Sequence, residues 1–132
     1  MSTSFWLLLI PFLLAACQQA VPPAPAMVAT TRALGTWEGR GSQTIGFTSE
    51  SGRFRVTWQT HHETLPGGGT FRLAAHSAVS GRPIQPITDH RGVGSGTTEV
   101  LDDPRPYNLM VESINIDWTI SVEDIVATPA RR

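Results

Sequence analysis

The four histidines of this 132-residue chain have the side-chain chemistry best suited to holding a metal ion or transferring a proton. His61 and His62 are adjacent and precede Glu63, whereas His76 and His90 lie farther along the chain. Adjacent side chains of a β-strand point to opposite faces, so this pair should not chelate as histidines one helical turn apart do. No spacing among the histidines matches a zinc motif. We predict a solvated strand end and no metal site, and retain His61 and His62 as possible ligand-binding residues.

Acidic residues offer a second candidate site. Asp102 and Asp103 precede Pro104, and Asp89 and Glu99 lie nearby, so loop carboxylates could bind calcium as they do in some jelly-roll modules. However, the chain contains no Asp-x-Asp-x-Asp-Gly loop, and Asp-Asp-Pro is typical of a turn. We predict a turn, keep calcium as the alternative, and expect no cofactor.

The serines do not form a recognisable nucleophile motif. Ser95 lies in the run Gly-Val-Gly-Ser-Gly at residues 92–96, which is not Gly-x-Ser-x-Gly and has no helix after it. Ser77 follows His76 directly, without any further signature of a catalytic triad. The glycine run predicts a flexible hairpin loop, and we expect the chain not to be an enzyme.

Trp37 is the aromatic residue with the clearest potential to bind a ligand. It is flanked by Thr36, Glu38 and Gly39 and precedes the regular strands. An exposed tryptophan could stack on a sugar ring or a partner surface, and the alternative is a tryptophan that caps the open end of the core. Trp37 is therefore a possible ligand-binding residue.

Residues 5–16 read FWLLLIPFLLAA and have the length of the apolar part of a signal peptide, being too short to span a bilayer as a helix. They end in Leu14-Ala15-Ala16-Cys17, which resembles the lipobox of bacterial lipoproteins. This resemblance implies cleavage before Cys17 and acylation of that residue, which would anchor the protein in a membrane. The non-aspartate residue Gln18 then favours the periplasmic side of the outer membrane. The alternative is an ordinary cysteine in a short core helix.

The rest of the chain divides by composition. We expect a signal peptide at 1–16, a lipid-anchored Pro/Ala-rich linker at 17–35, a β-sandwich domain at 36–126 and a disordered tail at 127–132. The lone cysteine excludes an intrachain disulfide, so the core alone must hold the domain together. The net charge of −1 gives no basic face, so we expect no nucleic-acid partner.

Residues beyond 36 alternate between apolar and polar side chains in short segments separated by glycines, which indicates strands. Four segments place an apolar triad on one face, at residues 53–60, 69–75, 106–112 and 117–123. Weaker strands are predicted at 42–48, 84–89 and 96–101. Their spacing predicts an all-β fold, a single antiparallel sandwich of about seven to eight strands with Greek-key or jelly-roll connections. Trp58 and Trp118 are expected to stack in its core.

The order of these motifs resembles a group of small, uncharacterised bacterial β-sandwich proteins that are often secreted or lipid-anchored. The motifs run Trp37-x-Gly39-x-Gly41, Gly52-x-Phe54-x-Val56-x-Trp58, Gly96-Thr97, Tyr107-x-Leu109-x-Val111 and Trp118-x-Ile120-x-Val122. The last two also resemble the closing strands of carbohydrate-binding jelly rolls and of small sandwiches appended to secreted peptidases.

Because these are core and turn positions, the resemblance implies a fold and carries no activity. The function expected is that of a lipid-anchored cell-envelope protein with a non-catalytic module that binds a protein or a glycan. The alternatives are an accessory domain, a weakly recognisable hydrolase with a histidine-centred or calcium site, and a purely structural envelope component.

Overall fold

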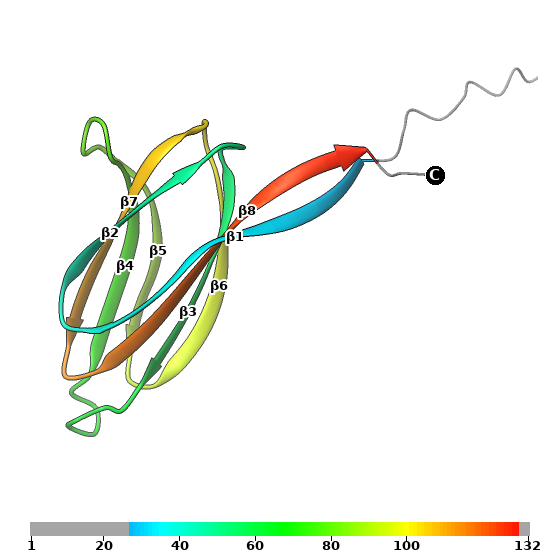
Figure 1. Cartoon of the computed structure of the whole chain (residues 1–132). Helices are drawn as coiled ribbons and strands as arrows, with labels where there is room; N and C mark the ends of the chain where they lie inside the picture. Colours follow the sequence, from blue (N-terminus) through cyan, green and yellow to red (C-terminus); the bar gives the residue numbers. More distant parts are fainter. Residues whose placement is uncertain (1–26, 130–132) are drawn as a thin grey trace, which may run out of the picture.

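The computed structural model describes residues 27–129, which form eight strands and no helix (Figure 1). The strands are β1 (Met27–Arg40), β2 (Gln43–Ser49), β3 (Arg53–His61), β4 (Thr70–Ser77), β5 (Pro83–Arg91), β6 (Gly94–Leu101), β7 (Arg105–Ile114) and β8 (Asp117–Pro129). They make two antiparallel sheets of four, in the orders β1-β8-β3-β6 and β2-β7-β4-β5. The predicted β-sandwich is confirmed.

The strand order selects the jelly roll among the predicted topologies. β1 pairs with β8, β2 with β7, β3 with β6 and β4 with β5, so the chain follows the path of one long antiparallel hairpin. Rolling this hairpin places its alternate pairs in opposite sheets. Only β4 and β5 are joined by a hairpin within one sheet, and every other connection crosses from one sheet to the other.

The core lies between the two sheets, and it is built by the predicted alternation. All four apolar triads are buried, and in β3 the inward residues Phe54, Val56 and Trp58 alternate with the outward Arg55, Thr57 and Gln59. The full set of triad residues is Phe54, Val56, Trp58, Phe71, Leu73, Ala75, Tyr107, Leu109, Val111, Trp118, Ile120 and Val122. Their burial is the main favourable contribution to folding, at about 25 cal/mol per Å² of apolar surface.

The two core tryptophans have separate neighbours, contrary to the predicted stack. The Trp58 ring lies 5.5 Å from Phe71 and 5.1 Å from His90, measured between ring centroids. The Trp118 ring covers Gly39 and donates a hydrogen bond from Nε1 to the Gly41 carbonyl at 3.0 Å. Trp118 therefore closes the end of the core beneath the β1–β2 connection, where its polar N–H finds a backbone acceptor.

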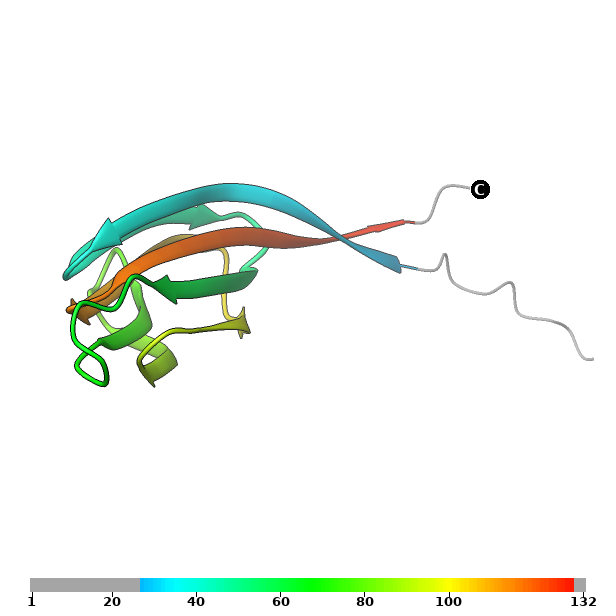
Figure 2. The ribbon, with the colours of Figure 1, turned by 90° about the horizontal axis from the view of Figure 1, so that it is seen from below.

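β1 begins at Met27, within the segment expected to be a linker, and β8 continues to Pro129, past the expected domain end at 126. Beyond Asp124, β8 pairs only with β1, so residues 27–31 and 125–129 form a two-stranded ribbon that projects from the sandwich (Figure 2). Residues 27–33 of β1 are all exposed, so they lack the apolar alternation by which strands are recognised. The predicted signal peptide at 1–16, the predicted lipidation site Cys17 and residues 130–132 of the predicted tail lie outside the described residues.

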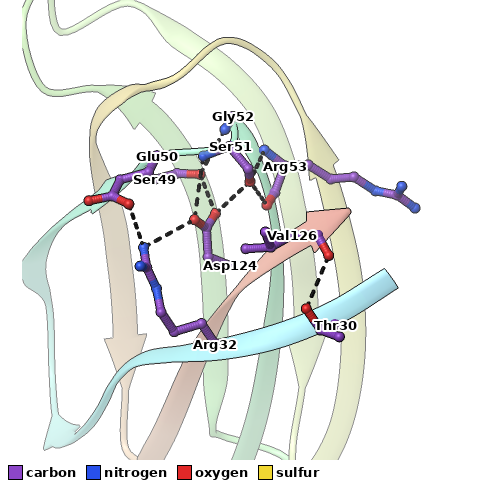
Figure 3. Close-up of polar contacts among 9 residues, drawn as sticks. All are labelled: Thr30, Arg32, Ser49, Glu50, Ser51, Gly52, Arg53, Asp124 and Val126. Carbon is purple, nitrogen blue, oxygen red and sulfur yellow. Dashed lines mark hydrogen bonds and ion pairs between the residues drawn. The ribbon is translucent and has the colours of Figure 1, made fainter. Parts of the chain in front are cut away.

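The ribbon leaves the sandwich at a buried polar cluster, the Asp124 network (Figure 3). The Asp124 carboxylate has no exposed surface and accepts hydrogen bonds from Ser49 Oγ at 2.6 Å and Ser51 Oγ at 2.8 Å. Its Oδ2 also lies 3.6 Å from the guanidinium of Arg32, its register partner on β1. The network therefore connects the β2–β3 corner to both strands at the base of the ribbon.

The segment at 92–96 is not the predicted hairpin loop: Gly92 and Val93 form a corner between β5 and β6, which lie in opposite sheets, and residues 94–96 begin β6. The Thr60 hydroxyl accepts a hydrogen bond from Gly94 N at 2.8 Å and donates one to the Gly92 carbonyl at 2.9 Å. A buried threonine of β3 thus fixes the path of the chain from one sheet to the other.

Candidate functional site

His61, His62 and Asp117 form the cluster of side chains with the clearest capacity for chemistry. Their potential ligand atoms all lie within 4.8 Å of one another. His61 and Asp117 are register partners on β3 and β8, and both point away from the core on the outer face of their sheet. The His62 Nδ1 lies 3.1 Å from Asp117 Oδ2.

The prediction that the two histidines point to opposite faces is wrong, because the strand ends between them. His62 has a φ of +53°, in the left-handed region, where a side chain no longer follows the strand alternation. Its ring turns to the same side as that of His61, and the ring centroids lie 4.8 Å apart in an edge-to-face arrangement. The expectation of no metal site depended on that alternation and on the absence of a zinc-motif spacing, and only the first of these grounds is removed.

Arg40 fixes the position of the Asp117 carboxylate. Its guanidinium donates to Asp117 Oδ1 at 2.7 Å, and it also contacts the His62 carbonyl at 3.5 Å and the Thr64 hydroxyl. The hydrogen bond from Arg40 is the main cause that lowers the pKa of Asp117, and the His62 ring lowers it further. Asp117 is therefore an anion whose Oδ2 is directed toward His62.

A hollow of about 280 Å³ adjoins the cluster. It is lined by Glu38, Gly39, His61, Asp117 and Trp118, so the cluster faces an open space with a second carboxylate on its rim. Glu38, Arg40 and Asp117 were not predicted as site residues. They come together through the register of β1 on β8, which pairs Arg40 with Asp117 and Glu38 with Thr119, and no local pattern encodes that register.

Glu63, which directly follows the two histidines in the sequence, binds elsewhere. Its carboxylate accepts hydrogen bonds from Gly67 N at 2.9 Å and Gly69 N at 3.2 Å. It thereby stabilises the glycine-rich loop between β3 and β4 and contributes nothing to the cluster.

The other two histidines are separate from this site and from each other. His76 lies on β4, and its Nδ1 is 3.3 Å from the Gly81 carbonyl at the end of the β4–β5 turn. His90 packs on Trp58 and covers Gly94, which has no side chain to obstruct the ring. Within residues 27–129, no serine or threonine hydroxyl is hydrogen-bonded to a histidine ring, so none of them forms a catalytic pair of the Ser–His type.

Trp37 caps the edge of the sandwich. It is half-buried and packs against the core, its ring lying 6.5 Å from Phe47 on β2 and directly over Gly35. β1 and β2 are the edge strands of the two sheets on this side, so Trp37 and Phe47 close the gap between them. This is the capping arrangement, the second of the two interpretations given for Trp37.

The acidic residues proposed for calcium are neutralised separately by arginines. Glu99 pairs with Arg53 and Arg55, at 3.1 and 3.0 Å, and these hydrogen bonds lower its pKa. Asp89 pairs with Arg72 at 3.3 Å on the other sheet. Carboxylates that lie apart and are already paired do not form the oxygen cage that calcium requires.

Asp102 and Asp103 form a turn held by Tyr107 and Arg105. Arg105 lies 3.2 Å from Asp102 and 2.9 Å from Asp103, and the Tyr107 hydroxyl donates to Asp102 at 2.9 Å and also contacts the Asp103 carbonyl. Burial alone raises the pKa of Asp102, but these contacts outweigh it and leave that pKa lowered. Burial and the bond to Asp102 raise the pKa of Tyr107. The hydroxyl bond to a backbone carbonyl just upstream corresponds to the tyrosine corner of β-sandwiches.

Neither serine is arranged as a nucleophile. The buried Ser77 hydroxyl accepts hydrogen bonds from the backbone N–H groups of Val79 and Ser80, at 3.3 and 3.4 Å. Ser95 is an exposed residue of β6 that pairs with Gln59 in the sheet. Ser77 therefore stabilises a turn, and Ser95 belongs to a regular strand.

A second, larger hollow of about 550 Å³ lies on the outer face of the other sheet. Its charged side chains are Arg72, Arg91, Asp89 and Glu112, and it is also lined by Ser42, Thr70, Ser113 and Ile114. Arg72 pairs with both carboxylates, at 3.3 Å to Asp89 and 3.5 Å to Glu112, so the surface is polar and carries opposite charges side by side.

Comparison with known proteins gives no family: no protein-family model matches the chain, and no curated protein matches it. Residues 27–129 contain no helix of the length and apolar character needed to cross a membrane.

Proposed function

We propose that this protein is a lipid-anchored component of the bacterial cell envelope and that its jelly roll is a non-catalytic module for binding a protein or a glycan. The proposal for the anchor is supported by the lipobox-like run that ends at Cys17. Residues 18–26 separate Cys17 from β1, and a fully extended chain of this length would reach roughly 30 Å. The sandwich would therefore be held close to the membrane surface.

The observation that carries the proposal is the position of these two hollows relative to the ribbon; a third hollow of about 280 Å³, lined among others by Asp102, Asp103 and Arg105, lies at the ribbon end of the sandwich. β1 runs from the ribbon to the far end of the sandwich (Figure 1). It ends at Arg40, which donates a hydrogen bond to Asp117 of the His61–His62–Asp117 cluster. From Asp117 to Pro129, β8 spans about 40 Å at 3.3 Å per residue. The cluster and its hollow thus lie at the end of the sandwich opposite the ribbon.

The larger hollow lies toward the same end. Thr70 begins β4, Ile114 ends β7, Arg91 ends β5 and Ser42 directly precedes β2, and all four line this hollow. A protein tethered through the ribbon would therefore present both hollows away from the membrane, where an envelope partner could reach them. The opposite charges around Arg72 suit hydrogen bonding to sugar hydroxyls or to a polar protein surface.

This binding function is tested by a glycan array together with cross-linking in intact cells. The full-length protein would be compared with an Arg72→Ala, Arg91→Ala double variant, which changes two exposed side chains of the larger hollow and leaves the core intact. We expect one class of glycan, or one envelope protein, to be captured by the wild type and lost from the double variant. Capture that is equal for both proteins, or no capture in either assay, contradicts the proposal.

A further inference from the structure

The His61–His62–Asp117 cluster has a chemistry that the proposed binding function leaves unused. Two imidazoles and one carboxylate are ligands of intermediate softness, which suit zinc and neighbouring late transition metals better than calcium or magnesium. Their ligand atoms lie within 4.8 Å of one another. We propose that this cluster is a binding site for a divalent transition-metal ion such as Zn²⁺, with the three side chains as ligands and an open coordination position toward the hollow. The proposal does not depend on the lipid anchor.

The spacing of the ligand atoms is close to what tetrahedral zinc requires. Bonds of ~2.0–2.1 Å place tetrahedral ligand atoms about 3.3 Å apart. His62 Nδ1 and Asp117 Oδ2 already lie 3.1 Å apart. The widest pair would have to close by about 1.5 Å from the 4.8 Å limit, which a rotation of exposed rings can supply. The His62 side chain is 78% exposed and His61 is half-buried, so the core need not move.

The backbone conformation of His62 is a second observation that favours a site. A left-handed φ is uncommon for residues other than glycine, although asparagine, aspartate and histidine tolerate it better than most. In an extended conformation this ring would face away from His61. The φ of +53° brings the second imidazole beside the first and opposite Asp117, which are the positions a metal ion needs.

The charges around the cluster allow a divalent cation. The nearby charged groups are Asp117 from β8 and Glu38 and Arg40 from β1, so with neutral imidazoles their formal sum is −1. Arg40 occupies Asp117 Oδ1 and leaves Oδ2 directed at His62. In metal sites, a carboxylate that binds the ion is commonly held in place by a hydrogen bond, and Arg40 supplies such a bond to Asp117 Oδ1.

The open coordination position would allow the bound ion to take a further ligand. Three protein ligands with a vacant fourth position are typical of sites that exchange water for an incoming ligand, in contrast to closed structural sites. The hollow lined by Glu38 and Trp118 lies on that side. The ion would therefore be available to a carboxylate or imidazole from outside at the end of the domain opposite the ribbon.

The test uses Zn²⁺ itself, titrated in competition with a chromophoric chelator. The full chain would carry Cys17→Ser, so that a thiol cannot supply a ligand and the result is the same whether or not the native protein is lipidated. His62→Asn removes the imidazole but tolerates the left-handed conformation, and His61→Gln keeps a polar side chain of similar length. His76→Gln, which changes a histidine on the opposite sheet, is the matched control.

We expect one Zn²⁺ per chain with a dissociation constant in the micromolar range, weakened at least about tenfold by His62→Asn or His61→Gln and unchanged by His76→Gln. Co²⁺ substituted at the same site should give visible absorption bands that disappear in the two cluster variants. Thermal unfolding of each variant would confirm that the fold is retained. No binding at ~100 µM Zn²⁺, or equal binding by the wild type and both cluster variants, would overturn the proposal.

Discussion

Replacement of Asp124 by alanine should destabilise the protein more than any surface substitution. The carboxylate is fully buried and accepts hydrogen bonds from Ser49 Oγ, Ser51 Oγ and, at 3.4 Å, Ser51 N. Asp124→Ala removes the acceptor and leaves the buried Ser49 hydroxyl without its acceptor, in the region that joins the β2–β3 corner to β8, whereas the exposed Ser51 hydroxyl can still donate to the Arg53 carbonyl at 2.8 Å. A buried donor left without its acceptor costs about 1–3 kcal/mol, and the other hydrogen bonds to the carboxylate are lost as well, so we expect a loss of about 2–3 kcal/mol.

That loss is a large part of the ~5–15 kcal/mol by which domains of this size are stable. It corresponds to a fall in melting temperature of roughly 8 °C or more, at about 4 °C or more per kcal/mol for a domain of this size. Asp124→Asn, which retains one acceptor oxygen, should lose less than half as much.

Urea unfolding of the full chain, followed by tryptophan fluorescence, measures these differences in the free energy of unfolding. Glu112→Ala is the control, because its carboxylate is 66% exposed and its single ion pair should contribute no more than ~1 kcal/mol. A double-mutant cycle with Ser49→Ala should show a coupling of about 1–3 kcal/mol. If Asp124→Ala costs less than about 1 kcal/mol, the network does not hold the base of the ribbon and the reasoning fails.

Three further predictions follow from other corners of the fold. Gly52→Ala should cost at least about 2 kcal/mol in urea unfolding, because Gly52 has a φ of +77° and a Cβ there would lie 2.6 Å from the Asp102 carbonyl oxygen; an unchanged midpoint would contradict this close approach. Tyr107→Phe should lower the free energy of unfolding by about 1–2 kcal/mol, since it removes the hydroxyl that joins the Asp102–Asp103 turn to β7, and a neutral effect would mean that the corner is held by packing alone. Acid should destabilise the protein: the lowered pKa values of Asp102 and Asp117 stabilise the fold above the unfolded value near 3.8, and this stabilisation is lost as pH falls through the lower folded values. Thermal melts should therefore be nearly constant from about pH 5 to 7 and fall below about pH 4, with a smaller fall in an Asp102→Asn variant.

The sequence was sufficient to predict the strands that have one face in the core. In β3, for example, Phe54, Val56 and Trp58 alternate with polar residues because the sheet separates core from solvent. The first half of β1 could not be recognised in this way. Its residues 27–33 are exposed on both faces, and their strand conformation depends on pairing with β8 nearly a hundred residues later.

The histidine cluster illustrates the same difference between local and long-range information. The adjacency of His61 and His62 was evident, but their common direction depends on the φ of His62, and the approach of Asp117 and Arg40 depends on the register of β8 with its two neighbours. Likewise, the choice of a jelly roll depends on pairings between strands far apart in the chain, such as β1 with β8. Alternation within a segment carries no information about these pairings.

Anchoring of this protein in the cell envelope through Cys17 can be measured by intact mass and membrane fractionation of the protein made in a bacterium, beside a Cys17→Ser variant. We predict that the wild type loses residues 1–16, gains the mass of acyl chains and partitions into the membrane fraction, and that Cys17→Ser abolishes the acylation and the partitioning. An unmodified, soluble product from both proteins would contradict the lipid anchor, because Cys17 would then be an ordinary cysteine. The proposed orientation of the two hollows away from a membrane would then have no basis.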